Sequence, residues 1–364
     1  MTPPSSTPIR RTGVRGDKSG VSNDGFSAGP IVKAHVGVVV INYKTPDLIK
    51  QCLTAMGPQL ERSDARVVVV DNHSADGSAE EIARFLSDAY GEGAGWKLRV
   101  SLVRSRENTG FSGGNNLGLG FLDADFYLLV NSDTMLKPGA ISALLGSAKA
   151  HPQAGVIGPR LEDGDGVVSA SAFRAISPAT VFMEAAQLSV LDALLPFFIV
   201  AKPLSDRPMR ADWVSFACVL LRRETVDAVG PMDAGYFMYF EDADYCRAAR
   251  KAGFEVLYDP AAHVVHLRGG SSSVKSEMAA KKRPPAYYYA ARTRYFRKTF
   301  GPAGPLLANI AWRAGRVLAH IRLIAGRKPP AICENEARDN WLNWRDPLGD
   351  GHAPADASPS SRRS

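Results

Sequence analysis

Cysteine is scarce in this chain of 364 residues, which has only four: Cys52, Cys218, Cys246 and Cys333. No two of them form a CxxC pair, which argues against a structural zinc site and a disulfide framework and fits a reducing compartment. The sequence also lacks a run of about 20 uninterrupted apolar residues, so it predicts no transmembrane helix. No apolar segment follows the basic residues near the N-terminus, so we expect no secretory signal.

Large apolar residues are also scarce at the two ends of the chain, which are rich in Pro, Ser and Gly. Such segments cannot bury enough surface to offset the entropy lost on ordering. We therefore predict a disordered N-terminal segment over 1–34 and a largely disordered tail over 331–364.

Acidic residues are nearly absent from the stretch between Lys275 and Lys328. Thirteen basic residues and one acidic residue, Glu277, give this stretch a charge of +12. Because the whole chain carries +7, the remainder carries −5. A basic segment on a mildly acidic body indicates a separate electrostatic task, with nucleic acid or an anionic membrane surface as the partner.

Apolar, β-branched runs alternate with helical segments in the body of the chain, from about 35 to 270. The predicted strands are 36–43, 65–72, 98–105, 126–133, 154–161, 212–223, 254–260 and 263–267. The predicted helices are 46–56, 78–90, 113–122, 138–150, 224–229 and 242–252. This rhythm is typical of an α/β fold, with a mostly parallel central sheet flanked by helices. Residues 165–210 are less regular and read as an inserted segment.

Polar residues follow four consecutive predicted strands. They are Asn42, then Asp71 and Asn72, then Asn108 and Gly110, then Asn131 and Asp133. Any one of these endings could be a helix cap. Ligands of open parallel sheets bind beyond the carboxyl ends of the strands, so four such endings predict a pocket for a base, a ribose and a cation.

Asp133 ends the apolar run FYLLVNSD and is a candidate metal ligand. One carboxylate, together with phosphate oxygens and waters, suits a hard divalent cation such as Mg²⁺ or Mn²⁺. The alternative is that Asp133 caps the helix that begins at Pro138, although the spacing is too long for a direct cap.

The glycine-rich stretch ENTGFSGGNNLGLG, residues 107–120, contains Gly110 and Asn115. Its glycine spacing is not that of a Rossmann fingerprint. It could bring backbone amides and a helix N-terminus close to a diphosphate, or its glycines could serve tight helix–sheet packing.

Glu241, Asp242 and Asp244 crowd the predicted start of a helix. A solvated acidic N-terminus is one reading. The apolar residues directly upstream favour a partly desolvated carboxylate instead, whose pKa would be raised toward that of a general base. Downstream, the spacing of His263 and His266 on a strand points them to opposite faces, so at most one should reach the site.

Several segments, in order, resemble glycosyltransferase family 2, and most closely its bacterial rhamnosyltransferase-like members. They are VINYKTPDLIKQCL, VVVVDNHSADGS, ENTGFSGGNNLGL, LLVNSDT, FEDADYCRAARKAGFEVLYDP and HVVHLRGG. The resemblance covers roughly 36–300. It implies a GT-A fold over 35–270 and inverting transfer of a sugar, with dTDP-rhamnose the favoured donor. The acceptor would be a glycan or lipid-linked glycan in cell-surface polysaccharide synthesis.

The resemblance also implies roles for individual residues. Asp71 matches the carboxylate that binds the pyrimidine base, Asp133 the metal ligand, His266 a second metal ligand and Asp242 the catalytic base. The other donor-binding candidates are Asn42, Asn72, Asn108, Gly110, Asn115 and Asn131. Two positions depart from the family pattern: Asn131 replaces the first acid of its DxD element, and Phe216 is bulkier than the usual residue near the acceptor.

Residues 271–330 predict a basic amphipathic helical extension. Apolar residues such as Ile310, Val317 and Ile321 can form one stripe flanked by arginines, which is typical of a helix in a membrane interface. The alternative is a helix packed on its own domain or on a second copy of the chain. We expect a cytoplasmic protein, peripheral on the inner face of the cell membrane.

Two other functions compete with glycosyl transfer. A sugar-phosphate nucleotidyltransferase needs a glycine-rich loop directly after its first strand, and this place reads INYKTPDL, without glycine. A noncatalytic nucleic-acid-binding protein would leave Asp71, Asp133 and Asp242 unexplained, and no nucleic-acid-binding module is recognised, so we expect no nucleic-acid partner.

Overall fold

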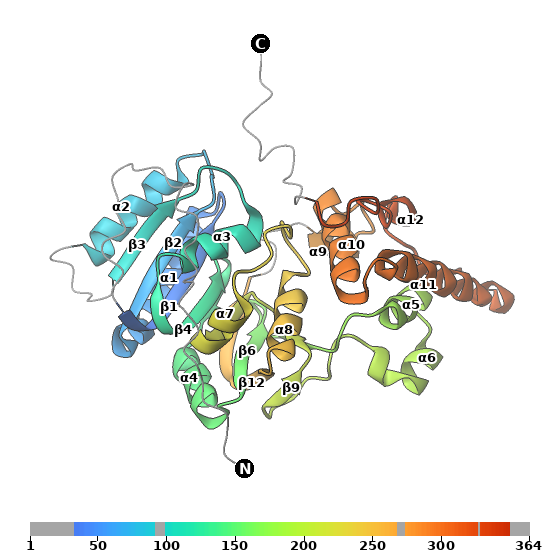
Figure 1. Ribbon diagram of the computed structural model, residues 1–364, viewed down its shortest axis with the longest axis horizontal. Helices are drawn as coiled ribbons and strands as arrows, with labels where there is room; N and C mark the ends of the chain where they lie inside the picture. Colours follow the sequence, from blue (N-terminus) through green and yellow to red (C-terminus); the bar gives the residue numbers. More distant parts are fainter. Residues whose placement is uncertain (1–32, 92–98, 268–273, 327, 350–364) are drawn as a thin grey trace, which may run out of the picture.

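The computed structural model describes residues 33–91, 99–267, 274–326 and 328–349 (Figure 1). Almost all of the segment predicted to be disordered, 1–34, lies outside the described residues. Its last two residues, Lys33 and Ala34, begin the first strand.

One sheet forms the centre of the molecule, in the order β3-β2-β1-β4-β11-β6-β12-β5. Its strands along this path are β1 (Lys33–Asn42), β2 (Ala65–Asp71), β3 (Arg99–Arg104), β4 (Asp123–Asn131), β5 (Thr134–Leu136), β6 (Ala154–Glu162), β11 (Cys218–Arg222) and β12 (Glu255–His266). β1, β2, β3 and β4 are parallel, as are β6 and β12, whereas β11 is antiparallel to β4 and to β6. The predicted α/β class with a mostly parallel sheet is confirmed.

Helices cover both faces of the sheet. They include α1 (Pro46–Leu60), α2 (Ser78–Tyr90), α3 (Gly110–Leu119), α4 (Ala140–Ala150), α7 (Arg223–Val229) and α8 (Glu241–Lys251). Side chains of a strand alternate between its faces. Val38 of β1 accordingly packs in one core with α1, α2 and α4, while Val39 packs in another with α3, α7 and α8. The unbroken valine run of β1 reflects burial on both sides.

The strand order reverses at β1. The chain steps from β1 to β2 and β3 on one side and then returns to place β4 on the other side of β1. In an open α/β sheet, the crevice beyond the carboxyl ends at such a switch point is where ligands bind. Ile41 pairs with Asn131 at this point, so the ends of β1 and β4 are adjacent.

Three expectations about the second half of the sheet were wrong in detail. The predicted strand over 212–223 is two strands, β10 (Trp213–Val214) and β11, separated by a turn. The two strands predicted at 254–260 and 263–267 are one strand, β12, with an irregularity between Asp259 and His263. β5 was not predicted, because it is only three residues long and exists by pairing with β12.

The inserted segment and the C-terminal region pack together. The former contains β7 (Val168–Ser169), β8 (Ala172–Phe173), α5 (Pro178–Ala186), α6 (Ser189–Leu194), η3 (Pro196–Phe198) and β9 (Met209–Ala211). The latter contains α9 (Val274–Ala279), α10 (Ala286–Phe300), α11 (Gly304–Ala319), η4 (His320–Ala325) and α12 (Glu336–Asp339). α5, α10 and α11 lie together on the right in Figure 1, and α11 packs on both other helices.

Residues 331–349 are not disordered, contrary to prediction. Asp339 of α12 is buried and accepts two hydrogen bonds from the Arg283 guanidinium. No pattern in the sequence indicated this order, because single buried polar partners rather than an apolar stripe hold the segment. Residues 350–364 lie outside the described part of the chain.

Among the described helices, none has both the length and the apolar character needed to cross a membrane.

Candidate active site

A cavity of about 1330 Å³ opens at the carboxyl ends of β1 and β4. Seven of the ten predicted site residues line it: Asn72, Asn108, Gly110, Asn131, Asp133, Asp242 and His266. They come from five separate stretches of the sequence. The arrangement brings an oxygen-rich strand edge and the start of α8 to one shared space.

Asp133 lies in the turn between β4 and β5, and its side chain is almost fully buried. The strand ends here because the chain turns back to pair β5 with β12, and that pairing sets His266 opposite Thr134. The backbone amide of Leu267 donates to the Asp133 carbonyl at 2.8 Å. As a result His266 Nε2 lies 3.3 Å from Asp133 Oδ1. Asp133 does not cap α4, whose N-cap is Gly139.

Asp133 and His266 offer one carboxylate oxygen and one imidazole nitrogen. In the described part of the chain, no group of three or more His, Cys, Asp or Glu side chains could hold a metal. A pair of protein ligands suits a divalent cation whose remaining positions are filled by substrate oxygens and water. His263 contacts Glu162 Oε1 at 2.8 Å instead, as its opposite orientation on the strand predicted.

Glu241 and Asp242 begin α8, and the chain enters this helix under backbone strain. Tyr239 and Phe240 both have positive φ, at 74° and 67°, which is uncommon for residues with large side chains. Glu241 is 7% exposed, and burial, followed by repulsion from Asp242, raises its pKa well above the ordinary value. A raised pKa favours the protonated form of Glu241.

The loop before α8 is fastened to α3 at two points. The Phe111 amide donates to the Phe237 carbonyl at 2.7 Å, and Gly110 has φ +68° with no room for a Cβ beside that carbonyl. The Asn116 side chain exchanges two 2.8 Å hydrogen bonds with the Met232 backbone. Gly110 was predicted to bind the donor; the structure gives it a further, packing role.

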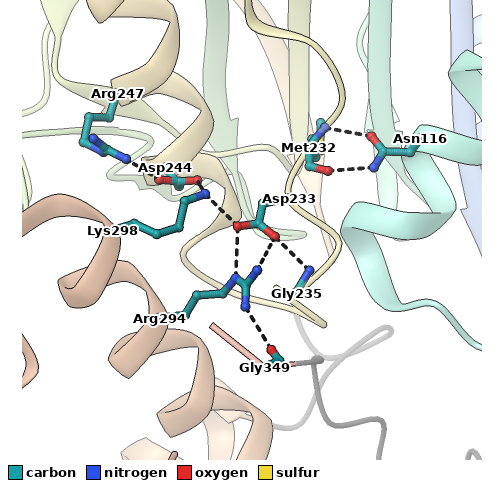
Figure 2. Close-up of polar contacts among 9 residues, drawn as sticks. All are labelled: Asn116, Met232, Asp233, Gly235, Asp244, Arg247, Arg294, Lys298 and Gly349. Atoms are coloured by element: carbon teal, nitrogen blue, oxygen red, sulfur yellow. Dashed lines mark hydrogen bonds and ion pairs between the residues drawn. The ribbon is translucent and has the colours of Figure 1, made fainter. Parts of the chain in front are cut away.

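A charged cluster fastens the same loop to α10 (Figure 2). Arg294 donates to both oxygens of Asp233, and Lys298 donates to Asp233 and also to Asp244 of α8. Asp233 in turn accepts from the Gly235 amide at 3.0 Å. Although burial tends to raise the pKa of Asp233, the bonds from Arg294 and Lys298 outweigh it and hold that pKa at about 2. We call Asp233, Asp244, Arg294 and Lys298 the Asp233 cluster.

Three predicted site residues, Asn42, Asp71 and Asn115, lie behind the cavity and are not among its described lining residues. Asn42 Nδ2 donates to Asp71 Oδ1 at 2.7 Å, and Ser74 Oγ donates to the same oxygen at 2.6 Å. Asn115 bonds back to the Phe111 carbonyl within its own helix. These side chains hold the loops that surround the cavity.

Other lining residues were not predicted. Tyr43 and Thr45 follow β1, and the Thr45 and Ser132 hydroxyls lie 3.2 Å apart across the switch point. Glu184 of α5 and Arg292 of α10 line the part of the cavity built by the inserted and C-terminal segments. The sequence held no signal for the last two, because neither belongs to a recognisable motif.

Comparison with known proteins agrees with this geometry. Residues 37–193 match the family described as Glycosyl transferase family 2. The N-acetylglucosaminyl-diphospho-decaprenol L-rhamnosyltransferase of Mycobacterium tuberculosis is 29% identical over 252 residues, which are 65% of this chain and 76% of the relative. Rhamnosyltransferase WbbL of Escherichia coli K12 is 40% identical over only 55 residues, 15% of this chain and 21% of WbbL.

A solved structure supports the fold. The crystal structure of GalNAc-T7 with UDP, GalNAc and Mn²⁺ superposes with a TM-score of 0.50 at 12% identity. The match covers 72% of this chain but only 48% of the GalNAc-T7 chain, so this chain spans about half of that protein. The family match over 37–193 and the GT-A architecture agree with the resemblance to glycosyltransferase family 2 and to its rhamnosyltransferase-like members that the sequence predicted.

Proposed function

We propose that this glycosyltransferase moves rhamnose from dTDP-rhamnose to a hydroxyl of a lipid-linked glycan, with inversion at the anomeric carbon, in cell-surface polysaccharide synthesis. The observation that carries the proposal is that Asp133 and Asp242 line one cavity at the switch point of the sheet. The similarity to a rhamnosyltransferase named for a diphospho-decaprenol-linked sugar supports the donor and the acceptor class.

In the proposed reaction Asp242 acts as the general base. Its carboxylate accepts the proton of the acceptor hydroxyl as that oxygen attacks the anomeric carbon. The bond from this carbon to the diphosphate oxygen breaks on the opposite side, and dTDP leaves with the electron pair. A single displacement of this kind inverts the anomeric configuration.

Asp133 and His266 would hold a divalent metal, Mg²⁺ or Mn²⁺, which when bound neutralises charge on the leaving diphosphate. Asn72, Asn108 and Asn131 present amide groups to the donor along the same strand edge. Asn42 and Asp71 fix the loop beneath it through their hydrogen bonds to each other and to Ser74. Recognition of the base by Asp71 stays a prediction.

A donor panel tests the proposal. The full chain is given dTDP-rhamnose, UDP-galactofuranose, UDP-glucose or GDP-mannose with Mn²⁺, and nucleotide release is measured. We expect release from dTDP-rhamnose to be the fastest and to stop when EDTA removes the metal. Equal rates with all four donors would contradict rhamnose preference, and undiminished release in EDTA would contradict the metal.

We also propose that the chain attaches peripherally to the inner face of the cell membrane. α11 and η4 leave a row of apolar side chains exposed, which we call the outer apolar face: Leu306, Leu307, Ile310, Val317, Ile321, Leu323 and Ile324. Much of the basic charge predicted to face lipid is used internally, for example by Arg294 and Arg316. The apolar residues therefore supply most of the proposed attachment.

A further inference from the structure

The part of the cavity lined by α5 and α10 has no role in the donor chemistry described above. It adjoins the catalytic loop, because the rings of Phe240 and Tyr288 lie 5.7 Å apart. Trp213, which also lines the cavity, stacks on Phe173 at 4.0 Å. Aromatic walls beside the general base suit a bound ring with apolar faces.

Glu184 is the acidic residue that α5 contributes to this region. Glu184 is exposed and lines the cavity, and desolvation raises its pKa. Repulsion from Glu336 adds to the shift, while Arg292 and Lys281 oppose it. In the described part of the chain Glu184 has no hydrogen bond or ion pair. A carboxyl that faces the cavity without a protein partner is available to hydrogen-bond a ligand.

Arg292 stands in the same region and is also incompletely paired. It is 7% exposed; Nη1 donates to Asn309 Oδ1 at 2.8 Å, and the guanidinium lies 5.2 Å from the Phe296 ring centre. Nη2 is buried and finds no partner among the described residues. Arg292 thus supplies positive charge behind Glu184 without neutralising it in an ion pair.

These residues are held in place by the contact of α5 with the C-terminal helices. Ser177 and Thr180 form a capping box that starts α5. At its other end Arg316 donates to the Ala185 carbonyl, and Arg322 donates to the Gln187 carbonyl. The wall that carries Glu184 is therefore fixed by the C-terminal segment.

We propose that Glu184, backed by Arg292, binds the sugar of the acceptor by accepting hydrogen bonds from its hydroxyl or acetamido N–H groups. This inference rests on the proposed function. It specifies that the subsite binds the sugar part of the acceptor. A sugar hydroxyl or N–H group can donate to this carboxyl in either protonation state, whereas the ionised form repels a phosphate, so a sugar suits the subsite better.

Binding without turnover is the first test. Octyl N-acetylglucosaminide is titrated into the full chain, without donor, by calorimetry. We expect Glu184→Ala to weaken binding about 10- to 100-fold, the usual effect of removing a hydrogen bond to a charged group. Glu184→Gln keeps a hydrogen-bond-accepting oxygen and should recover part of the loss, whereas Glu224→Ala, at an exposed position of α7, should change nothing. No binding to the unsubstituted chain, or equal binding to Glu184→Ala, would overturn the proposal.

Turnover separates this proposal from the proposed function. With dTDP-rhamnose, Glu184→Ala should raise the acceptor KM similarly for octyl N-acetylglucosaminide and for N-acetylglucosaminyl-diphospho-farnesol. The low rate of donor hydrolysis that occurs without an acceptor should stay unchanged. A rise in KM that is confined to the diphosphate acceptor would show that the subsite binds phosphate, and it would overturn the proposal. If the sugar binds through Glu184 but no acceptor stimulates release, the subsite stands and the proposed reaction fails.

Discussion

Glu241 and Asp242 are neighbours in the sequence but meet different surroundings. Both line the cavity, but Glu241 is buried, which raises its pKa, while Asp242 is partly exposed. Two adjacent carboxyls whose surroundings separate their protonation states can take different roles. Asp242 is the more exposed of the two, which is why it is the one proposed as the general base.

Replacing Asp242 by Asn should abolish transfer while keeping the donor site. Loss of a positioned general base lowers kcat by about 10²- to 10⁴-fold. Donor binding, measured by calorimetry with dTDP-rhamnose and Mn²⁺, should stay within a few-fold. Asp165→Asn, the same change in an exposed turn, is the control and should leave kcat unaltered. Full activity in Asp242→Asn would remove Asp242 from the mechanism.

Gly110→Ala should destabilise the protein more than Gly139→Ala. Both glycines have positive φ, at 68° and 88°, so each substitution carries the same kind of backbone cost, about 1 kcal/mol. A Cβ at Gly139 meets nothing within 4 Å, whereas one at Gly110 overlaps the Phe237 carbonyl. Urea denaturation should therefore show an additional loss only for Gly110→Ala, and equal losses would contradict the proposed contact.

At the scale of elements, the loop between α7 and α8, which leads to the proposed base Asp242, depends on its neighbours. It buries Met232, Tyr236 and Phe237, and it is also fastened by Asn116 of α3 and by the Asp233 cluster with α10 (Figure 2). Buried charges are tolerated there because each is paired and hydrogen-bonded. The helix α10, outside the family match, thus positions a loop of the active site.

Asp233→Asn should lower stability in a pH-dependent way. The folded-state pKa of Asp233, about 2, lies below the ordinary value of 3.8, so its stabilisation is present above pH 4 and is lost as pH falls toward 2. The shift corresponds to about 2 kcal/mol. Urea denaturation should show this difference at pH 7 and a smaller one at pH 3. Asp206→Asn, whose side chain is 94% exposed, is the control. A difference that does not shrink on acidification would contradict the pairing.

At the scale of the whole molecule, the C-terminal helices have two faces with different tasks. One face of α11 packs on α5, where Gly315 allows close approach to Ala185. The other carries the outer apolar face, with Val317 73% and Ile324 88% exposed. Both alternatives raised from the sequence, packing on the domain and facing a membrane, are therefore compatible, and the first is observed.

Replacing Val317, Ile321 and Ile324 together by Ser should weaken binding to phosphatidylglycerol-containing vesicles by at least about tenfold, because the loss of three buried apolar side chains exceeds 1.4 kcal/mol. Co-sedimentation of the full chain measures this. Val167→Ser, another exposed valine, is the control. These substitutions spare the α5 contact, which a deletion of α11 would destroy. Unchanged vesicle binding would contradict attachment through this face.

The sequence by itself determined the parallel core and most of the strand-edge site. Unbroken valine runs such as 67–70 and polar residues directly after them are local signals, and parallel strands necessarily bring their carboxyl ends to one edge. Only the tertiary structure decided that His266 reaches Asp133 through the pairing of β5 with β12. It also decided that Asn42 and Asp71 lie behind the cavity and that Glu184 and Arg292 line it. These depend on contacts between segments distant in sequence, and such contacts leave no periodic pattern in the chain.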